Sequence, residues 1–255
     1  MRQRQAPLFI LGRRSVKVIE TRPGGVPGSI TRGLVMHAMT HSHQICRAAT
    51  LGAAMCALVA AQSPALAFTV GITPGTRAIY LQVGNGTTFT GGNGTFSGGG
   101  TPTNNATINR ASVTVPANVL GNGTAQQFTS DSTQANSLYD NFAFCNPPVQ
   151  VYIGGFFRLP GTTGTATLSV TTPANLVNAG GDTIPFSQIS WTSSGNGDTG
   201  AQPVPAGAFN GGTLVLASFP VNTWRESCHT FFYANSSVVA AGTYTGRATY
   251  TLSAP

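Results

Sequence analysis

Short runs in which apolar and polar residues alternate recur from residue 76 to the end of the chain, and turns rich in Gly, Asn and Pro separate them. Because successive side chains of a strand point to opposite faces, this alternation predicts strands with one buried face. No long segment has the 3.6-residue period of an amphipathic helix. The pattern predicts eight strands, over residues 76–83, 106–115, 149–159, 165–171, 184–192, 214–219, 229–234 and 243–252.

Many short strands between turn residues are typical of an all-β fold, and we expect a single antiparallel β-sandwich. The last two predicted strands flank residues 240–242 and should pair as a C-terminal hairpin. Gly154 and Gly155 inside the third predicted strand indicate a bulge or a close approach of backbone. The Gly-rich segment 84–104 predicts a loop, and residues 133–139 predict a short helix.

The segment before these strands has the features of an export signal. An uncharged, mostly apolar run occupies residues 48–61, directly after an arginine, and an Ala-Leu-Ala site ending at Ala67 follows it. These are the parts of a secretory signal peptide, and the run is too short to cross a bilayer, which takes about 20 apolar residues. We predict a helical signal segment over residues 36–67, cleavage between Ala67 and Phe68, and a secreted domain of residues 68–255.

Residues 1–35 lie upstream of this signal and are rich in Arg, Pro and Gly without a periodic apolar face. We expect them to be a disordered extension. Signal peptides begin near the N-terminus of the translated chain. Met36 and Met39 are therefore alternatives to Met1 as the start of translation.

The charge of the chain is uneven. The whole sequence carries a formal charge of +7, but residues 1–67 hold eight of the 13 basic residues and only one acid. Residues 68–255 hold five Arg and five acidic residues, no Lys, and no net charge. A phosphate-binding groove needs clustered Lys and Arg. We therefore expect no nucleic-acid partner, and no membrane span after removal of the signal.

Two of the four cysteines, Cys145 and Cys228, remain after the predicted cleavage. In an oxidising compartment a remaining pair is expected to form a disulfide. The alternative is a nucleophilic Cys228 activated by His229. Neighbouring side chains of a strand point to opposite faces, which disfavours that dyad.

The secreted part contains few residues for chemistry. His229 is the single histidine of residues 68–255, and the five acids are scattered along the sequence. Asp140 and Glu226 are conceivable as a carboxylate pair for glycoside hydrolysis, but nothing in the sequence singles them out. We predict no catalytic residue, no metal site and no cofactor, and hence a protein that is not an enzyme.

Trp224 is the candidate ligand aromatic, because polar residues surround it in the sequence. An exposed indole could stack on a sugar ring, and burial in the core is the other interpretation. The first interpretation corresponds to an alternative function, a secreted carbohydrate-binding β-sandwich module with polysaccharide as its partner.

Residues 239–252, with the sequence VAAGTYTGRATYTL, resemble the terminal strand of bacterial chaperone–usher pilins and of the spore coat protein U group. The resemblance implies an incomplete immunoglobulin-like or pilin-like sandwich that a strand from a neighbouring subunit completes. It also implies a secreted structural or adhesive protein of the periplasm or cell surface, such as a subunit of a pilus or fimbrium that assembles by strand exchange. The implied partners are other copies of the chain, other surface subunits and a periplasmic chaperone.

The start of the secreted domain is the candidate donor strand for such an exchange. Phe68, Val70 and Ile72 are spaced two apart, so their side chains point to one side of an extended strand. The alternative is that residues 68–72 form an ordinary first strand of the domain's own sheet.

Overall fold

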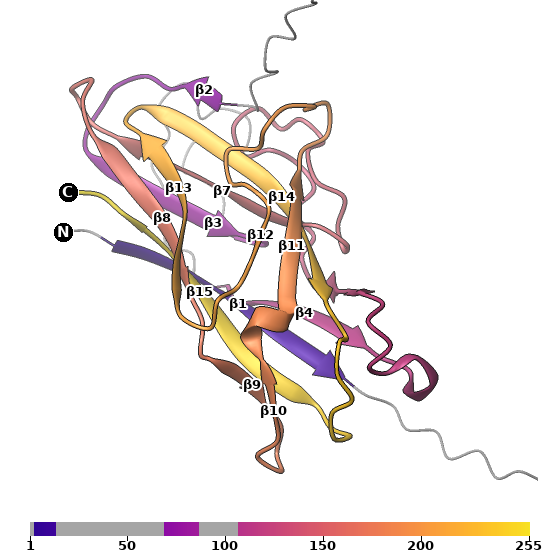
Figure 1. Cartoon of the computed structure of the whole chain (residues 1–255). Coiled ribbons are helices and arrows are strands. Elements are labelled where there is room, and N and C mark those ends of the chain that lie inside the picture. The colour runs from indigo at the N-terminus through magenta and orange to yellow at the C-terminus, as the bar shows by residue number, and fades with distance from the viewer. Residues whose placement is uncertain (1–2, 14–68, 87–106) are drawn as a thin grey trace, which may run out of the picture. The chain divides into compact units, whose positions relative to one another are not determined.

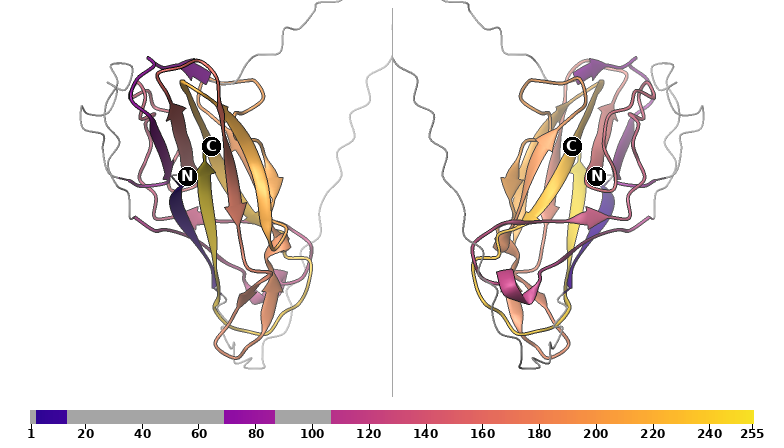
Figure 2. Two further views of the ribbon diagram at one scale, coloured as in Figure 1. Left: turned by 90° about the vertical axis from the view of Figure 1, so that its left-hand side faces the viewer. Right: turned by 90° about the vertical axis from the view of Figure 1, so that its right-hand side faces the viewer.

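The computed structural model describes residues 3–13, 69–86 and 107–255, which form two β-sheets facing each other across a hydrophobic core (Figure 1, Figure 2). This arrangement confirms the predicted all-β sandwich. Within the described ranges the helical turns are the two short 3-10 helices η2 (Ala117–Val119) and η3 (Phe186–Gln188).

The first sheet has eight strands. Along it, β10, β9, β15, β1, β4 and β6 are successive neighbours, while β8 pairs with both β15 and β13. Every pairing among the described strands is antiparallel except the parallel pair of β1 with β4. The strands are β1 (Gln3–Arg13), β4 (Asn109–Thr114), β6 (Thr129–Ser130), β8 (Thr165–Thr171), β9 (Asn175–Val177), β10 (Thr183–Pro185), β13 (Thr213–Pro220) and β15 (Tyr244–Ser253).

The second sheet has seven strands. Here β12, β11, β14, β7 and β3 are successive neighbours, and the short strands β2 and β5 also pair with β14. The strands are β2 (Thr69–Gly71), β3 (Ala78–Val83), β5 (Gln126–Gln127), β7 (Val151–Arg158), β11 (Ile189–Ser194), β12 (Gly207–Ala208) and β14 (Thr223–Tyr233).

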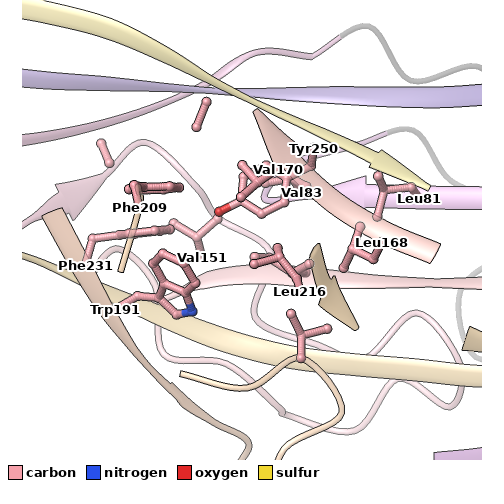
Figure 3. Packing of buried hydrophobic residues seen from close by; sticks show 14 of the residues in the cluster. Leu81, Val83, Val151, Leu168, Val170, Trp191, Phe209, Leu216, Phe231 and Tyr250 are labelled. Carbon is pink, nitrogen blue, oxygen red and sulfur yellow. The ribbon is translucent and has the colours of Figure 1, made fainter. Parts of the chain in front are cut away.

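The main core lies between the sheets and is built from the alternating apolar positions of their strands (Figure 3). Phe209 packs its ring at 4.8 Å from that of Trp191 on β11 and at 6.2 Å from that of Phe231 on β14. Tyr250 enters the same core from β15 and is fully buried. Each large side chain buried in this way contributes about 1.5–3 kcal/mol to the free energy of folding.

All eight predicted strands are present, with two differences in extent. The run over residues 184–192 is divided by η3 into β10 and β11. The run over residues 229–234 is the second half of a longer strand, β14. The missed first half contains Arg225 and Glu226, two charged residues that do not follow the apolar alternation.

The predicted C-terminal hairpin is wrong. β14 belongs to the second sheet and β15 to the first, so the chain crosses between the layers where a hairpin was expected. The predicted helix over residues 133–139 is also wrong. There, local side chains bond to the backbone: Gln134 Nε2 donates to the Asn136 carbonyl at 2.6 Å and Ser137 Oγ accepts from the Tyr139 amide at 3.0 Å. Such local bonds compete with a helix.

The two adjacent glycines of β7 allow a close approach of backbone rather than a bulge. β7 keeps a regular register with both β3 and β14 through Gly154 and Gly155. A Cβ on Gly155 would lie 2.2 Å from the Tyr80 carbonyl oxygen, which is far inside van der Waals contact. No residue other than glycine therefore fits this position without moving β3.

Residues 3–13, within the segment 1–35 for which disorder is the expectation, form β1 in this structure (Figure 1). Their sequence contains the apolar run Leu8-Phe9-Ile10-Leu11, which suits an inner strand of a sheet. Residues 1–35 as a whole are rich in Arg, Pro and Gly, so their composition did not indicate a strand at this short apolar run.

Candidate functional site

The first sheet depends on β1 for its continuity. β1 pairs with β15 from Gln3 opposite Ser253 to Gly12 opposite Tyr244. Its other edge pairs in parallel with β4. Within the described part of the chain, β1 is the one strand that joins β15 to β4. Without it, β15 and β4 would each present an unpaired edge at the middle of the sheet.

The candidate donor segment pairs with β14 of the same chain. Val70 lies in β2 and pairs opposite Trp224 of β14, and the Ile72 amide donates to the Asn222 carbonyl at 2.9 Å. Ile72 is buried in a second hydrophobic cluster. In this structure residues 69–71 are therefore an edge strand of the chain's own sheet, which is the arrangement of the alternative interpretation. Phe68 lies outside the described residues.

The second cluster covers the outer face of the second sheet. Period-2 alternation along β14 directs Trp224, Glu226 and Cys228 to this face. Cys228 forms the predicted disulfide with Cys145, with Cα atoms 5.6 Å apart, so the prediction is confirmed. The disulfide ties the irregular segment before β7 onto the sheet, which closes this face to solvent.

Trp224 is fully buried in that cluster, stacked on Phe156 and Tyr80 at 5.8 and 6.5 Å between ring centroids. Its indole Nε1 donates to Glu226 at 2.8 Å. A buried indole cannot stack on a polysaccharide, so the prediction of Trp224 as a ligand aromatic is wrong. Polar neighbours in the sequence suggested that Trp224 is exposed. One of them, Glu226, is instead buried with Trp224 and accepts the hydrogen bond of its indole.

Glu226 is a buried carboxyl group with two donors on one oxygen. Oε2 accepts from Tyr152 Oη at 2.6 Å and from Trp224 Nε1 at 2.8 Å, and a hydrogen bond with the Ser137 side chain also favours the carboxylate. Burial raises the pKa of Glu226, and the charge of Asp140 raises it further, against the lowering effect of Ser137, Tyr152 and Trp224. Burial and the adjacent Glu226 raise the pKa of Tyr152.

Glu226 lines a cavity of about 310 Å³ between the segment before β7 and the turn after β11. Asp140 and Glu226, the two carboxyls that the sequence made conceivable as a pair, line this same cavity. The other lining residues are Ser137, Phe142, Phe144, Asn196, Gly197 and Asp198.

His229 lies on the opposite side of β14, stacked on Trp191 in the main core at 5.6 Å between ring centroids. Its Nε2 lies 3.1 Å from the Val204 carbonyl, and burial lowers its pKa to about 4. Cys228 and His229 thus face different clusters, as the alternation of a strand requires, and do not form a catalytic dyad.

The predicted signal segment, its cleavage site at Ala67 and nearly all of the Gly-rich loop 84–104 lie outside the described residues. In the part of the chain that the structure describes, no helix is long and apolar enough to cross a membrane. The same part holds no group of three or more His, Cys, Asp or Glu side chains arranged to bind a metal ion.

The cavity was missed because the predicted strand began too late, at His229, whereas β14 begins at Thr223. Once β14 is extended to Thr223, the two-residue spacing of Trp224, Glu226 and Cys228 shows that a carboxyl shares a face with a disulfide. That spacing is the signal that could have identified Glu226.

Comparison with known proteins found no matching family model, and no curated protein or solved structure with significant similarity.

Proposed function

We propose that the protein is a secreted structural or adhesive protein of the cell surface, of the pilus or fimbrial subunit type, whose sandwich is completed by a strand from a neighbouring subunit. The observation that carries the proposal is the position of β1. A segment upstream of the predicted signal fills the middle of the first sheet, between β15 and β4.

β1 precedes the predicted cleavage site in the sequence, whereas its neighbours β15 and β4 follow it. Cleavage between Ala67 and Phe68 would separate β1 from the secreted domain, residues 68–255. That domain would retain β15 and β4 with a gap between them. Unpaired backbone groups at a sheet edge are a template for an added strand. A second subunit that supplies a strand there would restore the sheet and join the two subunits.

The chemistry of the domain is consistent with assembly outside the cytoplasm. Residues 68–255 carry no net charge, so little electrostatic repulsion opposes the association of copies. The Cys145–Cys228 disulfide suits the periplasm or the cell surface. A periplasmic chaperone that occupies the gap before assembly would prevent aggregation of the open edge.

The donor in this proposal is a strand similar in pattern to β1, taken from another copy or another surface subunit. Residues 69–71 are already paired with β14. The carbohydrate-binding alternative rested on an exposed Trp224, and this side chain is buried.

The test is expression of the complete reading frame in a secreting bacterial host, followed by mass spectrometry and gel electrophoresis without boiling. We expect a mature chain that begins at Phe68 and forms a ladder of multimers. A synthetic peptide of residues 3–13 should bind the open gap and shorten the ladder. A control peptide with serine at positions 8–11 should leave the ladder unchanged.

Two results would contradict the proposal. One is a secreted protein that remains monomeric at high concentration and does not bind the 3–13 peptide. The other is a secreted protein that retains residues 3–13 and keeps β1 in its own sheet.

A further inference from the structure

An apolar cavity of about 30 Å³ lies at the end of the main core where the chain crosses from β14 to β15. Both sheets contribute to its walls, with Val113 of β4 and Tyr244 of β15 from the first sheet and Tyr233 of β14 from the second. None of the described residues that line it is charged. These walls suit an apolar group, because a water molecule there would find few polar partners.

β1 passes between the two strands of the first sheet whose residues line this cavity (Figure 1). Gly12 pairs opposite Tyr244 of β15 and beside Val113 of β4. Residues opposite each other in neighbouring strands have their side chains on the same face of the sheet. Position 12 therefore belongs to the inner face, between two lining residues, and glycine supplies no side chain there.

The other inner positions of β1 combine differently with β15. Leu8 is opposite Ala248 and Ile10 is opposite Gly246, so a large residue of one strand is in register with a small residue of the other. This complementary pattern of large and small residues ends one position before the cavity.

Tyr244 does not take the place of the missing side chain at position 12. Its hydroxyl donates to the Ala240 carbonyl at 2.9 Å, which holds the ring toward the segment that crosses between the sheets. The space beside Gly12 therefore remains open as the cavity.

We propose that this cavity accepts a branched apolar side chain of the exchanged strand, at the position that Gly12 occupies in β1. The inference rests on the proposed function and specifies its partner. The donor is then a segment with large apolar residues at three successive inner positions, those of Leu8, Ile10 and Gly12. A cavity of about 30 Å³ suits a side chain the size of valine.

The added side chain gives the exchange a direction. β1 leaves the cavity empty, and the wall atoms of an empty cavity lose packing contacts. A donor that fills the cavity restores these contacts and buries its own apolar surface as well. Such a donor binds the gap more tightly than a strand with the pattern of β1, and therefore displaces it.

The experiment measures the binding of three fluorescein-labelled peptides to the purified mature protein by fluorescence anisotropy. The peptides are residues 3–13 of the natural sequence and the same segment with Gly12→Val or Gly12→Thr. The valine peptide should bind about tenfold more tightly than the natural one, because its side chain is buried in the cavity.

The threonine peptide is the matched control. Threonine has the shape and the strand preference of valine, so these properties are equal in the two peptides. Its hydroxyl finds no partner among apolar walls, and this peptide should bind about tenfold more weakly than the valine peptide.

Variants of the protein test whether the preference for valine arises at the cavity wall. Val113→Thr places a hydroxyl in the wall and should reduce the advantage of the valine peptide from about tenfold to about threefold. Thr114→Val is the neighbouring change on the exposed face of β4 and should leave the advantage unchanged. Both variants should bind the natural peptide as tightly as the unaltered protein does.

The results separate this inference from the proposed function. If the natural peptide binds and the valine peptide binds no more tightly, the gap accepts a strand and only the inference about the cavity fails. Equal affinities of the valine and threonine peptides would also overturn it, since strand preference would then explain the gain. So would an advantage for valine that Val113→Thr and Thr114→Val reduce equally. If none of the peptides binds, the proposed function itself fails, and this inference with it.

Discussion

Tyr152 on β7 donates a 2.6 Å hydrogen bond to Oε2 of Glu226 on β14, and neither side chain has exposed surface. The bond links the two strands on the outer face of the second sheet, under the segment that the disulfide holds down. It orients a carboxyl group that would otherwise be costly to bury, because a buried charge needs partners.

Removal of that carboxyl should be far more harmful than its conversion to an amide. Glu226→Ala leaves the Tyr152 hydroxyl and the Trp224 indole without an acceptor and opens a void, at a cost of about 2–4 kcal/mol of unfolding free energy. Glu226→Gln retains one oxygen for both donors and should change the unfolding free energy by about 1 kcal/mol or less. Urea unfolding followed by tryptophan fluorescence measures both. Equal losses in the two variants would contradict this account.

Gly155 of β7 and Gly71 of β2 should differ in their tolerance of a methyl group. Gly155→Ala places Cβ at 2.2 Å from the Tyr80 carbonyl, a backbone atom that cannot move without breaking the pairing of β3 with β7. We expect a loss of about 3 kcal/mol or more in unfolding free energy, or failure to fold. Gly71→Ala, at a strand position with no atom within 4 Å of the new Cβ, is the matched control and should be nearly neutral. Comparable losses at both positions would refute the packing argument.

The sequence predicted the strands well because each inner face repeats every second residue, as in residues 165–171 and 243–252. It did not predict which strands are neighbours. A short loop such as 240–242 suits a hairpin, but β14 and β15 lie in opposite sheets and contribute their inner faces to the same core.

The site was harder to predict than the fold. Glu226 and Trp224 are polar or amphipathic residues buried together, and their burial depends on a covering segment whose position follows from the disulfide. β1 was hidden for a different reason, because its pairing with β15 and β4 connects residues far apart in sequence. Local patterns contain no information on such long-range pairing.

Reduction of the Cys145–Cys228 disulfide should destabilise the covering segment and the whole domain. The bond closes a loop of 83 residues, which corresponds to about 4 kcal/mol in the chain-entropy model. Thermal unfolding with and without reductant measures the loss, and the double variant with alanine at both positions should match the reduced protein. Thiol labelling of the native protein should find neither cysteine free. A reduced protein with unchanged stability would show that the covering segment packs without the bond.

His229 should make the stability of the domain decrease as the solution becomes acidic. Burial lowers its pKa from 6.5 to about 4, so the folded chain resists a proton that the unfolded chain accepts. Between these two pH values the unfolded state binds more protons, and the unfolding free energy therefore falls as pH falls. Over the whole interval the loss is about 3 kcal/mol, and above pH 6.5 the effect is absent. Glu226 has the opposite sign, since its raised pKa means that the folded state gains a proton first as pH falls.

The variant His229→Gln separates the two contributions, because it removes the imidazole and leaves Glu226 in place. Urea midpoints measured from pH 7 to pH 4 should fall more steeply for the natural chain than for the variant, and the two curves should become parallel above pH 6.5. Parallel curves across the entire range would mean that His229 accepts its proton in the folded state as easily as in the unfolded one. In that case burial against Trp191 and the Val204 carbonyl would not keep the imidazole unprotonated in the folded state.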